Sequence, residues 1–537
     1  MDRPRTKQVC TIGPASGEKI AELVIAGMDV ARVNFSHGTA DDHRAYVHGV
    51  RSAAHSARRS VAVLVDLPGP KLRLGELEGG EARLATGAQF MLRTRVSEPA
   101  PAPMAQAVEE ISGPAQAEVA AESEATPPVE GEAAPESATD SGPSAAAQTD
   151  EPDTTVEIQT SVASVGDSTG ADVRGSDLSA QLQVGDRVLM ADGAVELTVS
   201  AIEPGLVTTE VVNGGLIRSR SGVNIPSERF TGEGLTDADR AGVARALELR
   251  VDLIAQSFVG SAADVHALRA LLPADGPRLI AKIETDAAVK DFEAICAAAD
   301  GIMVARGDLG VELPLEEVPL VQKRAIELCR AVAKPVIVAT QVLESMISSP
   351  VPTRAETSDC ANAVLDGTDA VMLSGETSVG EYPIITVETM ARIISNTEEK
   401  GYGRIAPYLT TPRTRGGAVT HAAAEIAEVL DIKYIVTFTQ SGDSAMRMSR
   451  LRPHTPMMAF TPDAGTQKRL ALSWGVHARL VKKVESTDEM VNLVDSYLKD
   501  SERAVDGDLV IVVSGTPVGV PGTTNSIFVH KVGQIRA

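Results

Sequence analysis

The feature that most constrains the fold of this chain is an alternation of short apolar runs with amphipathic stretches. The stretches repeat apolar residues at intervals of three and four, as helices do, and the runs have the length and composition of buried strands. Polar residues follow the runs, so they would gather at the carboxyl ends of parallel strands. Eight such alternations predict an α/β fold, a TIM (β/α)8 barrel with its active face at those ends. The runs end at Thr11, residues 32–36, Asp66, Ser257, residues 282–284, residues 306–308, Thr340 and residues 374–376.

Two neighbouring runs, residues 278–284 and 301–310, end in charged residues. Carboxylates such as Glu284 and Asp308 are hard oxygen ligands that suit a magnesium ion, which also holds substrate oxygens. Lys282 is a compact positive charge suited to a phosphoryl group. A buried ion pair is the alternative for one such strand, but two neighbours that end alike favour a site. We therefore predict Glu284 and Asp308 as ligands of Mg²⁺ or Mn²⁺.

Seven motifs give the chain a family resemblance, which runs from about Arg5 to Tyr402 and resumes more weakly near the C terminus. In this order they resemble pyruvate kinase: CTIGPAS, ARVNFSHG, IAKIET, MVARGDLG, ATQVLESMI, PTRAETSDCANAVLDG and MLSGET. The resemblance implies phosphoryl transfer from phosphoenolpyruvate to ADP, giving pyruvate and ATP. It also implies a homotetramer, a mobile lid and a regulatory domain.

A chain of 537 residues is too long for one core and predicts about three domains. We expect the barrel at residues 1–69 and 222–402. Residues 70–221 alternate apolar and polar residues between turns on both sides of an interruption, which predicts a small antiparallel β-barrel as the lid. Residues 403–537 predict an α/β domain, which the resemblance identifies as the effector domain.

Most of the net charge of −23 belongs to one segment, residues 97–177. It holds seventeen acids against the single Arg174, in a composition typical of disorder. We interpret it as a solvated insertion that leaves from a hairpin of the lid, with a docking or regulatory segment as the alternative. The remaining charge is about −7, without the basic patch of a nucleic-acid-binding protein.

Compartment is indicated by apolar runs and cysteines. No run approaches the roughly 20 residues that span a bilayer, and the N terminus lacks the apolar core of a signal peptide. Cys10, Cys296, Cys329 and Cys360 have neither pairing nor metal-ligand spacing, which suits a reducing compartment. We expect a cytoplasmic protein with buried thiols and without membrane or nucleic-acid partners.

The resemblance assigns roles at the substrate. Lys282 would stabilise the transferring phosphoryl group, and Arg32 and Arg73 would bind the phosphates in bidentate geometry. The backbone of Gly307 would approach the substrate carboxylate. Thr340, with Ser374, would relay a proton to the enolate or position the substrate.

Nucleotide binding falls by resemblance to Asn34, His37 and Arg73. The family usually has a lysine where this chain has Ser221. Arg220 is then expected to reach the nucleotide, or ATP binding is weaker.

The chain departs from the potassium-dependent members, which hold the cation with an Asn, a Ser, an Asp and a Thr, followed four residues later by a Glu. Asn34, Ser36 and Asp66 are kept, whereas the Thr position is Leu67 and the Glu position is Lys71. The ammonium of Lys71 could supply the missing charge internally. We predict that potassium is not required.

A loop in the last domain resembles the effector phosphate loop, through Thr439, Ser441, Gly442 and Ser444. Backbone amides at such a turn can bind an anion. Asp443 places a negative charge there, which disfavours fructose bisphosphate and favours a sugar monophosphate, AMP or no effector.

Two other functional classes remain open. A barrel with paired carboxylates could be a phosphoenolpyruvate or pyruvate lyase or aldolase, although the lid, Arg32 and Arg73 argue against it. A catalytically silent regulator is the other alternative. Four intact residues argue against it: Lys282, Glu284, Asp308 and Thr340.

Overall fold

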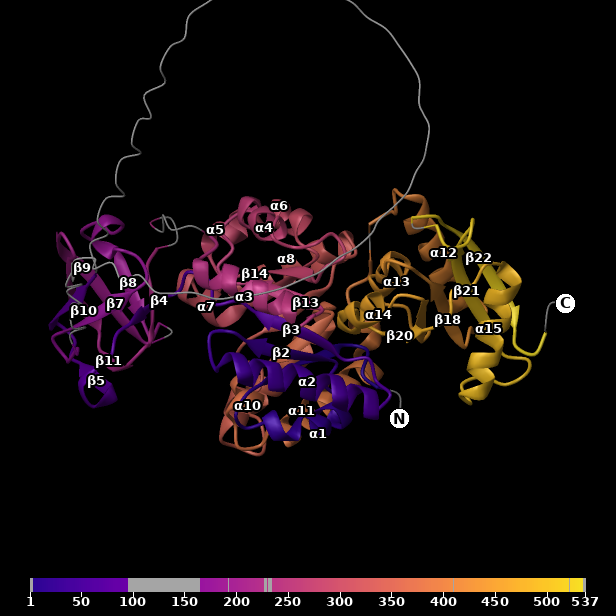
Figure 1. Ribbon diagram of the computed structural model, residues 1–537, viewed down its shortest axis with the longest axis horizontal. Helices are drawn as coiled ribbons and strands as arrows, with labels where there is room; N and C mark the ends of the chain where they lie inside the picture. Colours follow the sequence, from indigo (N-terminus) through magenta and orange to yellow (C-terminus); the bar gives the residue numbers. More distant parts are fainter. Residues whose placement is uncertain are drawn as a thin grey trace, which may run out of the picture. The chain divides into compact units, whose positions relative to one another are not determined.

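The computed structural model describes residues 3–94, 165–191, 193–226, 229, 234–408, 410–520 and 522–534. Eight parallel strands close into a barrel in the order β1-β17-β16-β15-β14-β13-β3-β2, which confirms the predicted TIM barrel (Figure 1). Its strands are β1 (Lys7–Ile12), β2 (Val30–Asn34), β3 (Ala62–Asp66), β13 (Leu253–Gln256), β14 (Arg278–Ile283), β15 (Gly301–Ala305), β16 (Val336–Ala339) and β17 (Ala370–Leu373).

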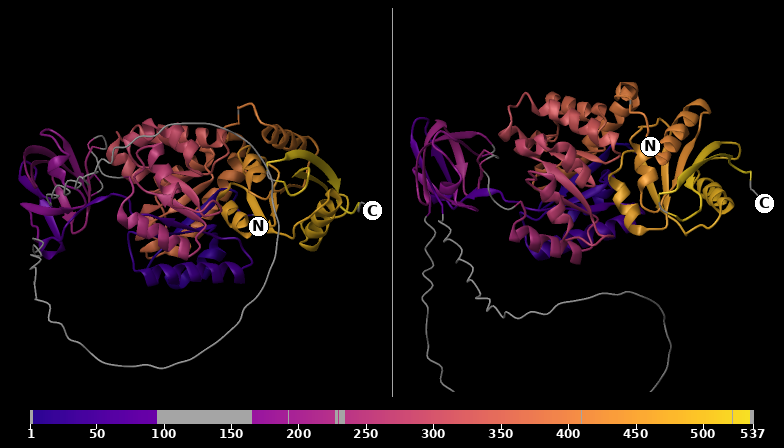
Figure 2. Two further views of the ribbon diagram at one scale, coloured as in Figure 1. Left: turned by 45° about the horizontal axis from the view of Figure 1, so that its top comes forward. Right: turned by 90° about the horizontal axis from the view of Figure 1, so that it is seen from above.

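Helices between the strands cover the outside of the barrel (Figure 2). Capping boxes at the helix starts include those of Thr39, Thr236 and Thr353, each contributing about 1 kcal/mol. The helices are α1 (Ile20–Ala26), α2 (Ala40–Ser56), α3 (Asp237–Glu248), α4 (Ala262–Arg269), α5 (Asp286–Lys290), α6 (Phe292–Ala298), α7 (Arg306–Glu312), α8 (Val318–Ala331), α9 (Arg354–Asp366), α10 (Gly375–Ser378) and α11 (Pro383–Gly401).

Aliphatic side chains fill the barrel interior, among them Leu64, Ile280, Met303 and Ile337. Because this interior is packed, polar groups are accommodated at the strand ends, as in other barrels. The four cysteines, all within the described residues, are buried free thiols. Among the described helices, none combines the length and apolar character needed to cross a bilayer.

The predicted lid is a second closed barrel in the order β10-β6-β7-β4-β12-β8-β9, with its own apolar core. β5 (Glu81–Leu84) and β11 (Gly215–Arg218) pair in a separate two-stranded sheet, and in the sequence each lies between strands of this barrel. The barrel strands are β4 (Leu72–Leu74), β6 (Gln89–Arg93), β7 (Gly170–Arg174), β8 (Arg187–Met190), β9 (Val195–Glu203), β10 (Leu206–Asn213) and β12 (Gly222–Asn224).

Three expectations about the lid need correction. β7 lies inside the expected insertion, because the buried residues Ala171 and Val173 pack into the lid core. β12 pairs with β4 and β8, so the lid continues past residue 221. β6 and β7 pair in parallel, whereas a hairpin joins antiparallel strands, so the insertion does not leave from a hairpin. Most of the insertion lies outside the described residues.

The last domain is the predicted α/β unit, a five-stranded sheet in the order β20-β19-β18-β21-β22. β22 alone runs antiparallel to its neighbour, and the other pairings are parallel. Its elements are α12 (Arg415–Val429), β18 (Tyr434–Phe438), α13 (Asp443–Ser449), β19 (Met457–Thr461), α14 (Ala464–Arg469), β20 (Val476–Leu480), α15 (Thr487–Asp500), β21 (Leu509–Gly515) and β22 (Thr524–Lys531).

His477 on β20 predicts a pH dependence of stability. Burial, with the charges of Lys7 and Arg479, lowers the pKa of His477 to about 3. The unfolded chain binds this proton near pH 6.5, so the stabilising contribution is present above pH 6.5 and is lost as the pH falls toward 3. We expect the free energy of unfolding to lose about 2 kcal/mol from this residue between pH 7 and pH 5.

Urea unfolding at both pH values measures the effect. His477→Phe should lose about 2 kcal/mol less than the wild type over that interval. His48→Phe, at an exposed position on α2, serves as the control. Equal losses in the wild type and His477→Phe would contradict the prediction.

Candidate active site

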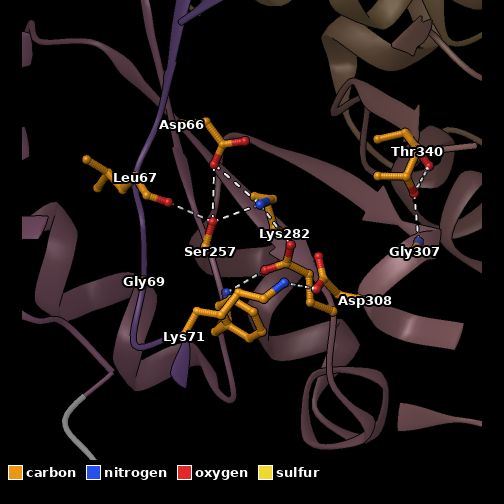
Figure 3. A network of polar contacts seen from close by, with 12 residues as sticks. Asp66, Leu67, Gly69, Lys71, Ser257, Lys282, Gly307, Asp308 and Thr340 are labelled. Carbon is orange, nitrogen blue, oxygen red and sulfur yellow. Dashed lines mark hydrogen bonds and ion pairs between the residues drawn. The ribbon is translucent and has the colours of Figure 1, made fainter. Parts of the chain in front are cut away.

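Lys282 lies at the centre of the polar network at the carboxyl ends of the strands (Figure 3). Its Nζ donates to Ser257 Oγ at 2.7 Å and lies 2.8 Å from Glu284 Oε1 and 3.3 Å from Asp66 Oδ1. Burial alone would lower the pKa of Lys282, but the carboxylates of Asp66 and Glu284 outweigh it and raise the pKa. The side chain is only 10% exposed and is held as a buried cation.

Glu284 is fully buried after β14, and its Oε2 accepts the Phe258 N–H at 2.7 Å. Its Oε1 accepts no well-aligned hydrogen bond, although Lys282 Nζ is near. Burial raises the pKa of Glu284, and Lys282 only partly offsets this rise. For Asp308, burial acts upward, but the charges of Lys71 and Lys282 outweigh it and lower the pKa.

The two carboxylates fit a divalent cation. Within the described residues, no group of three or more His, Cys, Asp or Glu side chains could hold a metal. A magnesium ion bound by Glu284 and Asp308 would therefore complete its shell with water and substrate oxygens, which is how Mg²⁺ commonly binds. The unshared lone pairs of Glu284 Oε1 suit that role.

Lys71 contacts the Asp308 carboxylate of the site. Its Nζ lies 2.6 Å from Asp308 Oδ1 and 5.6 Å from the centroid of the Phe258 ring. Within the part of the chain that the structure describes, Lys71 makes no hydrogen bond or ion pair with Asn34, Ser36 or Asp66.

The three positions that the family resemblance links to a monovalent cation are engaged with other groups. Asn34 Oδ1 accepts the Ser36 N–H at 3.0 Å. Asp66 Oδ2 lies 2.7 Å from the guanidinium of Arg32, and Asp66 Oδ1 accepts from Ser257 Oγ at 3.1 Å. Arg32 therefore supplies a cation to this carboxylate from within the protein.

Thr340 and Gly307 meet at the ends of β16 and β15. The Gly307 N–H donates to Thr340 Oγ1 at 2.7 Å, and that hydroxyl donates to the Ala339 carbonyl at 2.6 Å. Thr340 has φ 66°, a strained conformation for a β-branched residue and typical of functional sites. A Cβ at Gly307 would lie 3.5 Å from Thr340, an ordinary contact, so the protein itself leaves room there.

Ser374 follows β17, and its buried Oγ has no hydrogen-bond partner among the described residues. Its N–H donates to Glu376 Oε2 at 2.6 Å. A buried hydroxyl without a partner is costly, so the site retains a free donor and acceptor here.

The predicted nucleotide residues divide into two groups. Partial burial, followed by the charges of Arg73 and Arg32, lowers the pKa of His37. Arg220 instead pairs with Glu76 at 2.8 Å and is largely exposed, while its carbonyl accepts from Arg73 at 3.3 Å. The guanidinium of Arg220 is therefore engaged away from the Lys282 network.

In the last domain, the expected effector loop borders a pocket with the adjacent Lys482 and Lys483. Thr439 Oγ1 accepts the Gly442 N–H at 2.9 Å, Gly442 has φ 93°, and Ser444 Oγ contacts Thr524 Oγ1 at 2.6 Å. Ser441 also lines this pocket. Asp443 pairs with Arg447 at 2.6 Å, which neutralises the charge that the sequence presented as an obstacle to phosphate.

Sequence reasoning missed Ser257, Phe258 and the two lysines of the pocket beside the Thr439–Ser444 loop. Ser257 was visible as the end of an apolar run, but a serine after a strand is common. Lys482 and Lys483 lie about 40 residues beyond the loop in sequence, and only the fold brings them to it.

Comparison with known proteins independently supports the family resemblance. The family model described as pyruvate kinase, barrel domain, matches residues 3–106 and 132–387, and the model of the pyruvate kinase alpha/beta domain matches residues 417–530. A pyruvate kinase of Mycobacterium tuberculosis is 44% identical over 99% of both chains, and one of Corynebacterium efficiens is 41% identical over 99% of this chain and 98% of its own. The crystal structure of a pyruvate kinase from Cryptosporidium parvum has a TM-score of 0.79 at 30% identity and covers 99% of this chain and 96% of its own. The chain belongs to the pyruvate kinase family.

Proposed function

We propose that the family's reaction, transfer of the phosphoryl group of phosphoenolpyruvate to ADP to give pyruvate and ATP, takes place around Lys282. The buried, charged Nζ of Lys282 beside two carboxylates carries this assignment. A cation fixed in a site of low dielectric constant stabilises the charge of the transferring group without reorganisation. Family membership disfavours the lyase and aldolase alternatives, and the assembled Lys282, Glu284 and Thr340 disfavour a silent regulator.

The family requires a divalent metal, and we assign its binding to Glu284 and Asp308, with Mg²⁺ or Mn²⁺ as the ion. When bound, this ion neutralises phosphate charge and stabilises an enolate. Arg32 and Arg73 orient the phosphates. The backbone of Gly307, at the start of α7, lies close to the substrate carboxylate.

Thr340 and Ser374 are proposed to deliver the proton to the enolate carbon. A threonine hydroxyl is too weak an acid to act alone, so water passes the proton through these hydroxyls. The free Ser374 Oγ supports the relay. Thr340 also positions the substrate through its contact with Gly307.

We expect turnover to be independent of potassium. Lys71 and Arg32 supply positive charge through Asp308 and Asp66, and Leu67 removes one oxygen of the potassium site. Pyruvate formation from phosphoenolpyruvate, ADP and magnesium should be equal in potassium and tetramethylammonium salts. Lys71→Glu should make turnover dependent on potassium.

This assay tests the proposed function as well. Turnover only with potassium would reject Lys71 as an internal cation and keep the kinase. Absence of turnover in both salts would reject the kinase proposal.

A phosphorylated small molecule is the proposed effector, bound by the loop at Thr439–Ser444 with Lys482 and Lys483. The sequence favoured a sugar monophosphate or AMP over fructose bisphosphate, and the Asp443–Arg447 pair weakens the objection to the bisphosphate. Activation curves with all three compounds should show a response to a monophosphate that Lys482→Ala abolishes. An unchanged response to the monophosphate in Lys482→Ala would reject this pocket as the effector site.

Family resemblance supports a cytoplasmic homotetramer as a further proposal. Light scattering of the purified protein measures the tetramer.

A further inference from the structure

Phe258, two residues after the end of β13, has a backbone conformation that a bulky side chain rarely adopts. Its φ is 54°, in the left-handed region. Such a conformation persists only where surrounding contacts enforce it, and it is common at functional sites. Its N–H donates to Glu284 Oε2 at 2.7 Å, so the main chain of Phe258 holds one of the two candidate metal ligands.

The ring of Phe258 and the carboxylate of Asp308, the other candidate metal ligand, both contact Lys71. Lys71 Nζ lies 5.6 Å from the ring centroid and 2.6 Å from Asp308 Oδ1. An ammonium over an aromatic face is attracted by the electron density of the ring. The flexible side chain of Lys71 therefore has two partners, an acidic one and an aromatic one.

The backbone that leads to Lys71 also packs on Phe258. A Cβ added at Gly69 would lie 3.0 Å from Phe258 Cδ2 and 2.9 Å from Ser257 Cβ. Gly69 itself has φ 67°. The segment between β3 and the lid strand β4 thus passes directly against the ring, two residues before Lys71.

We propose that Phe258 is a positioning residue that holds the ammonium of Lys71 against Asp308 with its ring while its main chain holds Glu284. The placement of Lys71 rests on its contacts with Asp308 and with the Phe258 ring. The catalytic consequence rests on the proposed function of Lys71 as an internal cation.

Two variants separate the ring from the rest of the residue. Phe258→Leu keeps an apolar side chain and the N–H to Glu284 but removes the aromatic face. Phe258→Tyr keeps the face. Phe258→Met is a second apolar variant if the leucine protein does not fold, and melting temperatures identify folded variants.

The first readout is the rate of reductive methylation of Lys71, measured by mass spectrometry on the full chain without substrates or metal. We expect methylation about fivefold faster in Phe258→Leu, because the ammonium loses one of its two partners. Phe258→Tyr should stay within about twofold of the wild type. Lys290 on α5, 70% exposed, is the internal reference whose rate should be equal in all three proteins. Equal methylation of Lys71 in the wild type and Phe258→Leu would overturn the proposal.

The second readout is turnover in tetramethylammonium salts. Phe258→Leu should lower kcat about fivefold with little change in the KM for ADP, and Phe258→Tyr should lose less. Faster methylation with unchanged kcat would support the placement by Phe258 and reject the internal-cation function of Lys71. The two failures are therefore distinguishable.

Discussion

Replacing Lys282 with methionine is expected to lower kcat by about 1,000- to 100,000-fold, the range found when a cation that stabilises phosphoryl transfer is removed. Methionine has a similar length and no charge, so the transferring group would lose its nearest fixed cation. The variant would also bury Asp66 and Glu284 without their shared partner, and its stability should fall by about 3 kcal/mol. Pyruvate formation and urea unfolding measure the two effects separately.

Two further variants make this result specific. Lys282→Arg keeps the charge and should recover part of the stability, but less of the activity, because the guanidinium has a different shape. Lys290→Met, on the exposed surface of α5, should leave both quantities unchanged. Turnover within tenfold of the wild type in folded Lys282→Met would show that another group stabilises the transferring phosphoryl.

Glu284→Gln is expected to weaken Mn²⁺ binding by at least about 100-fold. The amide keeps the shape of the side chain, and its oxygen can still accept the Phe258 N–H, but the negative charge is gone. Hard divalent cations bind carboxylates far better than amides when only two protein ligands are available. Electron paramagnetic resonance of free Mn²⁺ measures the affinity without substrates.

Glu293→Gln, 70% exposed on α6, is the matched control and should bind Mn²⁺ as the wild type does. Unchanged Mn²⁺ affinity in Glu284→Gln would remove this residue from the metal site. Weaker binding with full turnover at saturating Mn²⁺ would limit its role to affinity.

The barrel was predictable because each strand has a local sequence signal, an apolar run that ends in a polar residue. The convergence of Lys282, Glu284 and Asp308 was predictable for the same reason, since strand ends meet at one edge of a barrel. The partner of Lys71 could not be predicted. Asp308 is 237 positions away in the sequence, and the two side chains belong to different domains. Chain spacing carries no information on such a contact.

The predicted C-terminal boundary of the insertion was wrong because it was drawn from composition. Residues 165–177 are mostly small or acidic, as the residues of the preceding segment are, so they were grouped with it. Their burial depends on pairing with β4 and β6, which lie more than 75 positions earlier. The strain at Phe258 was equally invisible, because backbone angles at a non-glycine residue follow from contacts rather than from residue type.

The parallel pairing of β6 and β7 limits how the protein can be shortened. Met91 is opposite Gly170 and Arg93 is opposite Asp172, so the chain that leaves β6 must return along the strand before it enters β7. A splice that joins the two strands directly would force either an antiparallel pairing, which loses the register of β7 with β6, or an unpaired strand. An engineer who trims this region must therefore retain a return connection of several residues, even if the rest of the insertion is dispensable.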